Sequence, residues 1–257
     1  MTIRASTFDD ILFASIHVYG QGSGTLGSGD KKIVHVTVED CHLTNVGSVG
    51  LGVTGFNGIG GTIHVKGTAM YGRGHGYDEG DTIGIVMDVD QAGMDFVKIE
   101  NSSFSRFTAA VLKTEKYSIA SFNISNVDID SCFSGMYLLP NIDEIWMENI
   151  EVTDSQEFGI ILYPKSDSNE QSKIVMKDVS VCSSDGSDVI FSTGTVDHEV
   201  NIIGTLTCDE VNDFVSFTAN FEDVTSQYCT NDCTPVSLFL ALWFLCLDFH
   251  GCFELLP

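Results

Sequence analysis

The chain has 257 residues, of which 43% are hydrophobic, so it is long enough to bury a substantial core. Its 12 basic and 36 acidic residues give a formal net charge of −24, which disfavours binding to nucleic acid and to an anionic membrane. The acidity serves either solubility or a specific cation-binding role.

Residues 1–30 are predicted to hold a partial N-terminal coil and a flexible Gly/Ser loop, GQGSGTLGSGDK at residues 20–31. The first residues do not show a basic region followed by an apolar run, so no signal peptide is evident. The repeat described next is already under way near Ile16 and Val18. We therefore expect that residue 1 is not the true beginning of the protein.

Residues 31–220 contain seven segments with a shared pattern of apolar and turn residues. The first apolar position recurs at spacings of 23 to 34 residues, at Val38, Val65, Ile99, Ile124, Met147, Met176 and Ile203. Two residues later comes a turn residue: Asp40, Gly67, Asn101, Asn126, Asn149, Asp178 and Thr205. A second apolar position follows at Leu43, Met70, Phe104, Ile129, Val152, Val181 and Cys208. A third follows at Leu51, Val111, Met136, Ile160, Val189 and Val215, and later, near Ile85, in the second segment.

Apolar and polar residues alternate within each segment, which is the period of a β-strand, and no segment holds a 3.6-residue helical pattern. Three short strands per segment, separated by Asn, Asp, Gly and Ser, fit a stack of coils. The irregular spacing disfavours a propeller, whose blades need four longer strands. The sequence therefore predicts an all-β, single-stranded parallel β-helix of about seven coils.

The pattern resembles the right-handed parallel β-helix, or pectin-lyase-like, superfamily over about residues 31–220. That resemblance implies a right-handed coil and a ladder of stacked asparagines at one turn, here Asn101, Asn126 and Asn149. It does not select a function, because such folds host lyases, hydrolases, epimerases, adhesins and structural shafts.

The second coil is the longest, and its extra residues, GRGHGYDEGD at 72–81, are expected to form a loop on one face. The loop is a candidate ligand-binding site through Arg73, Asp78 and Glu79. His75 and its flanking glycines resemble the Gly-His-Gly motif of polygalacturonases. Lys113 of the next coil resembles the lysine of their Arg-Ile-Lys motif. This resemblance implies His75, Lys113 and Asp81 as catalytic candidates, projecting from one face of adjacent coils.

That resemblance is incomplete. Val111 and Leu112 replace the arginine and isoleucine of the second motif, and the preceding stretch VGLGVTGFNGIGG lacks the paired aspartates that the hydrolysis needs. The pectate-lyase arginine motif is also absent. The alternative is a solvated loop and an ordinary lysine.

Asp88, Asp90 and Asp95 follow the loop and resemble half of a calcium site, with Asp81 nearby. Ile99 stands where a calcium loop has its glutamate, so a solvated turn is the alternative. Two glycosylation sequons begin at Asn101 and Asn123. Asn123 is predicted to point outward, and Asn101 to be inaccessible at the ladder turn.

Eight cysteines show no zinc-site spacing, and their pairing stays open. Cys41 and Cys208 fall at interior positions, where a thiol acts as a small hydrophobic group. Residues 221–257 form a cysteine-containing hydrophobic tail with the run VSLFLALWFLCL after Pro235. This run is shorter than the roughly 20 residues of a membrane span, so it covers an open coil, signals a lipid anchor or is a truncated end.

Taken together, these features indicate an extracellular or cell-surface domain that binds polysaccharide or cell-surface glycan, or that serves as a structural shaft. A membrane partner is expected only if the tail is an anchor. The alternative is a polysaccharide hydrolase, lyase or epimerase, with calcium as a possible cofactor.

Overall fold

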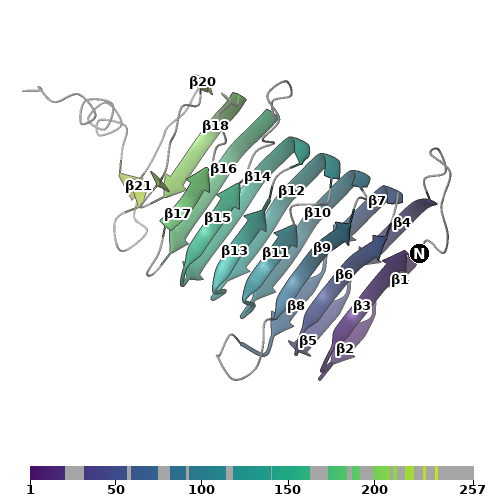
Figure 1. Cartoon of the computed structure of the whole chain (residues 1–257). Coiled ribbons are helices and arrows are strands. Elements are labelled where there is room, and N and C mark those ends of the chain that lie inside the picture. Colours follow the sequence, from purple (N-terminus) through teal and green to yellow (C-terminus); the bar gives the residue numbers. More distant parts are fainter. Residues whose placement is uncertain are drawn as a thin grey trace, which may run out of the picture.

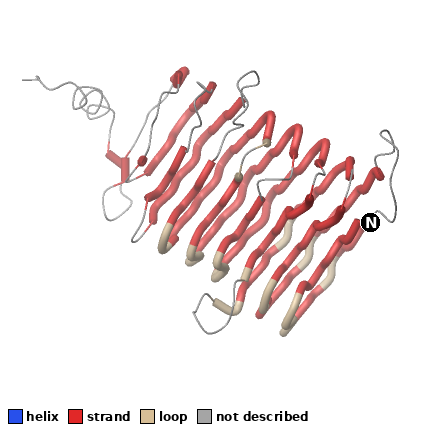
Figure 2. The backbone as a smooth tube through the Cα atoms, in the orientation of Figure 1, coloured by secondary structure: helices blue, strands red, loops and turns tan. Residues whose placement is uncertain are grey.

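The computed structural model describes residues 1–20, 32–56, 59–74, 82–90, 93–113, 118–139, 141–162, 173–183, 187–191, 199–208, 211–212, 218–222, 228–229 and 235–236. Within these ranges the chain is all-β and contains no helix (Figure 2). The predicted fold class is confirmed at this level.

Two long parallel sheets make up most of the described part of the chain. The strands of the first sheet are, in order, β1(Thr2–Arg4), β4(Lys32–Glu39), β7(Ile59–Lys66), β10(Gly93–Ser105), β12(Ser118–Asp130), β14(Ile142–Ser155), β16(Lys173–Ser183), β18(Glu199–Cys208) and β20(Thr218–Glu222). The short strands β2(Thr7–Asp9), β5(His42–Val46) and β8(Ala69–Gly72) join it. The second sheet contains β3(Ala14–Gly20), β6(Val49–Phe56), β9(Ile83–Asp90), β11(Ala109–Lys113), β13(Ser134–Leu138), β15(Phe158–Leu162), β17(Ser187–Phe191) and β19(Val211–Asn212). An antiparallel pair, β21(Tyr228–Cys229) and β22(Pro235–Val236), stands apart from both.

Each unit of the repeat pairs with the next one along the chain, so the strands stack in sequence order (Figure 1). The stacking is solenoid-like and consistent with a β-helix. The first unit is already formed by residues 2–20, since β1, β2 and β3 pair with β4, β5 and β6.

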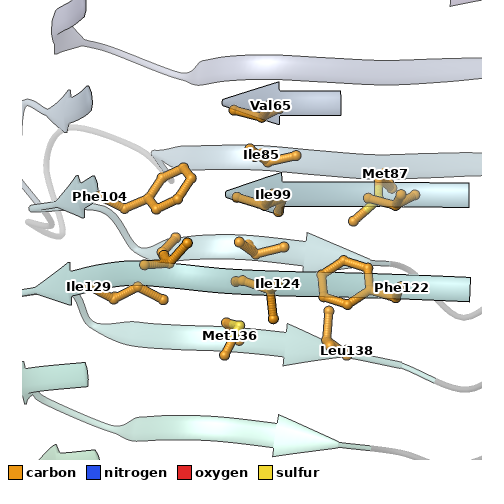
Figure 3. Packing of buried hydrophobic residues seen from close by; sticks show 14 of the residues in the cluster. Val65, Ile85, Met87, Ile99, Phe104, Phe122, Ile124, Ile129, Met136 and Leu138 are labelled. Carbon is orange, nitrogen blue, oxygen red and sulfur yellow. The ribbon is translucent and has the colours of Figure 1, made fainter. Parts of the chain in front are cut away.

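The predicted interior positions form straight columns of register partners. Val38, Val65, Ile99, Ile124, Met147 and Met176 are paired strand by strand, and each is fully buried. In the columns built on Leu43 and Leu51, the side chains of the units up to β15 are buried in the same way. Figure 3 shows how side chains of the two sheets, such as Ile124 and Met136, meet in the interior. This continuous apolar core supplies the main stabilisation of the fold.

The seventh segment departs from the predicted register. Met176 pairs with Ile202, and the predicted partner, Ile203, pairs with the outward Lys177. The register shifts between Lys177 and Val179, where β18 carries one extra residue, so Cys208 still aligns with Val181. The assignment of Ile203 to the interior column was therefore wrong by one residue.

The first corner of each coil uses the left-handed backbone region. Asp40, Asn101, Asn126, Asn149 and Asp178 have φ of 50 to 53°, and Gly67 has φ of 58°. Asn and Asp tolerate this region better than other non-glycine residues, which explains their recurrence at the predicted turn position. The predicted asparagine ladder is present: Asn126 Nδ2 donates to Asn101 Oδ1 at 3.2 Å and Asn149 Nδ2 to Asn126 Oδ1 at 2.9 Å.

The residue after this corner bonds back across it through a side-chain hydroxyl or thiol group. Thr68 Oγ1 donates to the carbonyl two residues earlier at 3.0 Å, and Ser102 Oγ does the same at 2.8 Å. Cys41 Sγ makes the equivalent contact at 3.3 Å and is free and buried, as expected for an interior thiol. Cys132 is also free and buried, and burial raises the pKa of its thiol to about 12. Cys182 is disulfide-bonded.

Small residues occupy the first positions of several strands in the second sheet. A Cβ on Gly50 would lie 2.6 Å from the carbonyl oxygen of Gly84, and a Cβ on Gly135 would lie 2.3 Å from that of Gly159. Both distances are well inside van der Waals contact, so neighbouring coils approach each other closely there.

Candidate functional site

The inserted loop of the second coil leaves and returns to the fold at one place, which we call the loop base (Gly72–Gly74 and Thr82). Thr82 Oγ1 donates to the carbonyl of Gly74 at 3.4 Å and so connects the two ends of the loop. Thr82 and Thr108 also exchange two hydrogen bonds, each from a backbone nitrogen to a hydroxyl oxygen, at 3.1 and 3.3 Å. The loop base is thus fixed to the next coil.

Arg73 lies in this base and makes structural contacts rather than pointing freely toward a ligand. One of its guanidinium nitrogens pairs with Asp10 at 3.1 Å, and Nε donates to the carbonyl of Asn45 at 3.1 Å. Arg106 of the following coil donates to the carbonyl of Arg73 at 3.3 Å. Together these contacts join the loop base to both neighbouring coils and to the first one.

An aromatic pair lies beside the loop base. The rings of His42 and Tyr71 are 5.3 Å apart, centre to centre, at 56° to each other. Tyr71 immediately precedes the base and is 39% exposed. An exposed aromatic pair can pack against the apolar face of a ligand.

His75, Asp78, Glu79 and Asp81, the other candidates in this loop, lie outside the described residues. Their predicted roles stay predictions.

Lys113 is not where a ligand-contacting lysine was expected. It occupies an interior column with Met87 and Leu138 as register partners, and its side chain is fully buried. Its ammonium donates to the carbonyl of Leu139 at 2.8 Å. Moreover, Lys113 is the last residue of β11, whereas Thr82 of the loop base comes just before the first residue of the neighbouring parallel strand β9. The two residues therefore lie at opposite ends of the strands. The expectation that Lys113 projects outward was therefore wrong, because the alternation that buries Val111 also buries Lys113.

The predicted calcium ligands do not gather into a site among the described residues. Asp88 is exposed on β9 in the second sheet, whereas Asp95 lies on β10 in the first. The Asp95 carboxylate accepts a hydrogen bond from the backbone nitrogen of Gly61 at 2.9 Å. The side chain of Asp90 lies outside the described set. Within that set no three His, Cys, Asp or Glu side chains are grouped to hold a metal ion.

The outer face of the first sheet carries a regular grid of polar side chains that the sequence alone did not single out. We define this outer face by the outward side chains of β1, β4, β7, β10, β12, β14 and β16 before the first corner. One column contains Arg4, Glu39, Lys66, Glu100, Ser125, Glu148 and Lys177 as successive register partners. The next contains Thr2, Thr37, His64, Lys98, Asn123, Trp146 and Val175.

Several charges on the outer face are paired with one another. Arg4 pairs with Glu39 at 2.6 Å, Lys173 with Glu144 at 3.0 Å, and Lys177 with Glu148. Glu100 accepts from both Lys98 at 2.6 Å and His64 at 2.9 Å. The hydrogen bond from Lys98 holds the pKa of Glu100 below its usual range, and that from Lys177 does the same for Glu148. The carboxylates therefore stay ionised at neutral pH.

Trp146 lies on β14, near the C-terminal end of this grid. Its ring is partly exposed, and its Nε1 donates to Glu148 Oε2 at 3.4 Å. Glu148 is the same carboxylate that pairs with Lys177. Trp146, Glu148, Lys177 and the adjacent Asn123 thus form a connected group on three strands, which we call the Trp146 platform.

Asn123, the predicted glycosylation site, points outward as expected and is partly exposed, with Ser121 Oγ 3.4 Å from its Oδ1. Asn101 of the other sequon is exposed too, although it belongs to the asparagine ladder. The expectation that Asn101 is inaccessible was wrong, because the ladder runs along an outer corner.

Compared with known proteins, the chain matches no protein-family model, no curated protein and no solved structure. Among the described residues, no helix is both long and apolar enough to cross a membrane.

Proposed function

We propose that this chain is a right-handed parallel β-helix of about seven coils, of the pectin-lyase-like kind, that binds polysaccharide at the cell surface or outside the cell. The observation that carries this proposal is the outer face of the first sheet. Polar side chains recur on it from strand to strand, about 4.8 Å apart, and the partly exposed indole of Trp146 lies among them. A linear polymer lying across the strands would meet a polar group at each strand.

Binding is favoured over catalysis by the position of Lys113. The motif that suggested a hydrolase needs this lysine at the ligand, but it is buried in the interior and bonded to a backbone carbonyl. A domain that holds a polymer on a regular sheet face needs no such group. A purely structural shaft is the simpler alternative, and it predicts no ligand.

The proposal is tested by incubating the purified chain with a panel of soluble polysaccharides, with and without calcium, and measuring retardation in affinity gel electrophoresis. We expect retardation by at least one polysaccharide with no release of reducing ends or unsaturated products. Product formation would favour the enzyme alternative, and the absence of any retardation would favour the structural shaft.

A further inference from the structure

We infer that the Trp146 platform is the ligand subsite of the outer face and that it takes a neutral polysaccharide, one built of uncharged pyranose rings. This inference rests on the proposed function and adds the location of the site and the class of ligand.

The first argument is the state of the indole. Its only polar group, Nε1, is already directed along the strand to Glu148. The partly exposed ring carbons are therefore available to the C–H face of a sugar ring, since an aromatic face packs well against apolar surface. Trp146 lies between its register partners Asn123, which is partly exposed, and Val175, which is 2% exposed.

The second argument is the polar rim around the ring. Glu148 offers carboxylate oxygens, Lys177 offers N–H donors, and Asn123 offers a side-chain amide, on three adjacent strands. Sugar hydroxyl groups donate and accept, so they match this mixture of groups. Because the carboxylate and the ammonium already neutralise each other, a neutral ligand binds without leaving either charge unpaired.

The third argument is the charge of the surroundings. The chain has a net charge of −24, and beyond the first corner the outward positions of the same strands include Asp128, Asp130 and Glu151. No lysine or arginine points outward in the described part of that stretch, which comprises β2, β5, β8 and the second halves of β10, β12, β14 and β16. The basic groups of the outer face nearest to Trp146, Lys173 and Lys177, are paired with Glu144 and Glu148, so the net negative charge of the chain repels an acidic polysaccharide but not an uncharged one.

The test compares three forms of the full chain by affinity gel electrophoresis in neutral polysaccharides (hydroxyethylcellulose, glucomannan, xyloglucan) and acidic ones (polygalacturonate, alginate). The forms are the natural chain, Trp146→Ala, and Phe13→Ala as a matched loss of an exposed aromatic ring elsewhere, since Phe13 is 79% exposed. We expect a neutral polysaccharide to retard the natural chain. Trp146→Ala should raise the dissociation constant at least tenfold, and Phe13→Ala should change it less than twofold.

A second measurement does not depend on the folding of Trp146→Ala. The chain has two tryptophans, so Trp243→Phe leaves Trp146 as the sole indole, and the bound neutral polysaccharide should shift its fluorescence emission. If neutral polysaccharide binds but neither the emission nor the Trp146→Ala affinity changes, the subsite is wrong while the proposed function stands. Binding of acidic polysaccharides alone would overturn the ligand class. Binding of none would overturn the proposed function itself.

Discussion

The side-chain nitrogen of Asn149 donates to the side-chain oxygen of Asn126 at 2.9 Å across two adjacent coils, and both residues have left-handed backbones, with φ of 52° and 51°. The same amide thus satisfies two demands at once. Asparagine accepts the left-handed conformation, and its side chain links one coil to the next.

Asn126 is the central member of this ladder, so its replacement removes two side-chain bonds. We expect Asn126→Ala to lower the free energy of unfolding by about 2 to 3 kcal/mol, from the lost bonds and the left-handed backbone. Asn126→Gly removes the same bonds without the backbone penalty and should cost about 1 kcal/mol less. Urea unfolding followed by circular dichroism gives both values. Equal losses in the two variants would show that the backbone conformation contributes nothing.

The interior columns should not tolerate an unpaired charge. Ile150 and Val179 are 2% and 1% exposed and are register partners of each other. We expect Ile150→Asp and Val179→Asp to abolish folding, because an unpaired buried carboxylate costs several kcal/mol. Lys177→Ala, at an outward position, should change stability by about 0.5 kcal/mol. A soluble Ile150→Asp chain that melts cooperatively would contradict the assigned register.

Much of this register could be predicted from the sequence. The alternation of apolar and polar residues and the recurring turn residue each indicate, independently, which positions of a strand point inward. The prediction failed at Ile203 because two adjacent isoleucines fit the pattern equally well, and only pairing with Met176 selects Ile202. For Lys113 the pattern did contain the answer: two residues beyond the interior Val111, it had to point inward. The Trp146 platform could not be found, since its members lie far apart in sequence and meet only through strand pairing.

The loop base predicts that the inserted loop can be shortened. Because Thr82 Oγ1 and the Gly74 carbonyl lie 3.4 Å apart, few residues are needed to connect the two ends. Replacing residues 75–81 with two glycines should leave the melting temperature within a few degrees of the natural chain. Polysaccharide retardation should also persist. Loss of retardation with an unchanged melting temperature would instead place the ligand at this loop.

Lys113 offers a direct comparison of binding and enzyme hypotheses. We expect Lys113→Met to fold and to change the free energy of unfolding by less than about 1.5 kcal/mol, since an apolar side chain of similar length suits the interior. Polysaccharide affinity should be unchanged. If the natural chain releases products from any polysaccharide and Lys113→Met does not, the lysine has a role that its burial does not suggest.

Acid should weaken the outer face through Glu100. Its folded-state pKa lies below the ordinary value of 4.5, so its contribution to stability is present above that pH and is lost as the pH falls through the lowered pKa. We expect the natural chain to lose stability more steeply than Glu100→Gln below about pH 4.5. Thermal melts between pH 7 and pH 3 measure the difference, and parallel curves for the two chains would contradict it.

The close approach of neighbouring coils at Gly50 and Gly135 limits which sequence changes such a chain can accept during evolution. A unit can gain or lose residues between its strands, as the insertion after Gly72 illustrates, without disturbing the stack. At Gly50 and Gly135, however, even a Cβ atom would lie 2.6 or 2.3 Å from a backbone oxygen of the adjacent unit. Units could therefore be duplicated, deleted or exchanged during evolution only with partners that keep this position small, whatever the outward side chains have become.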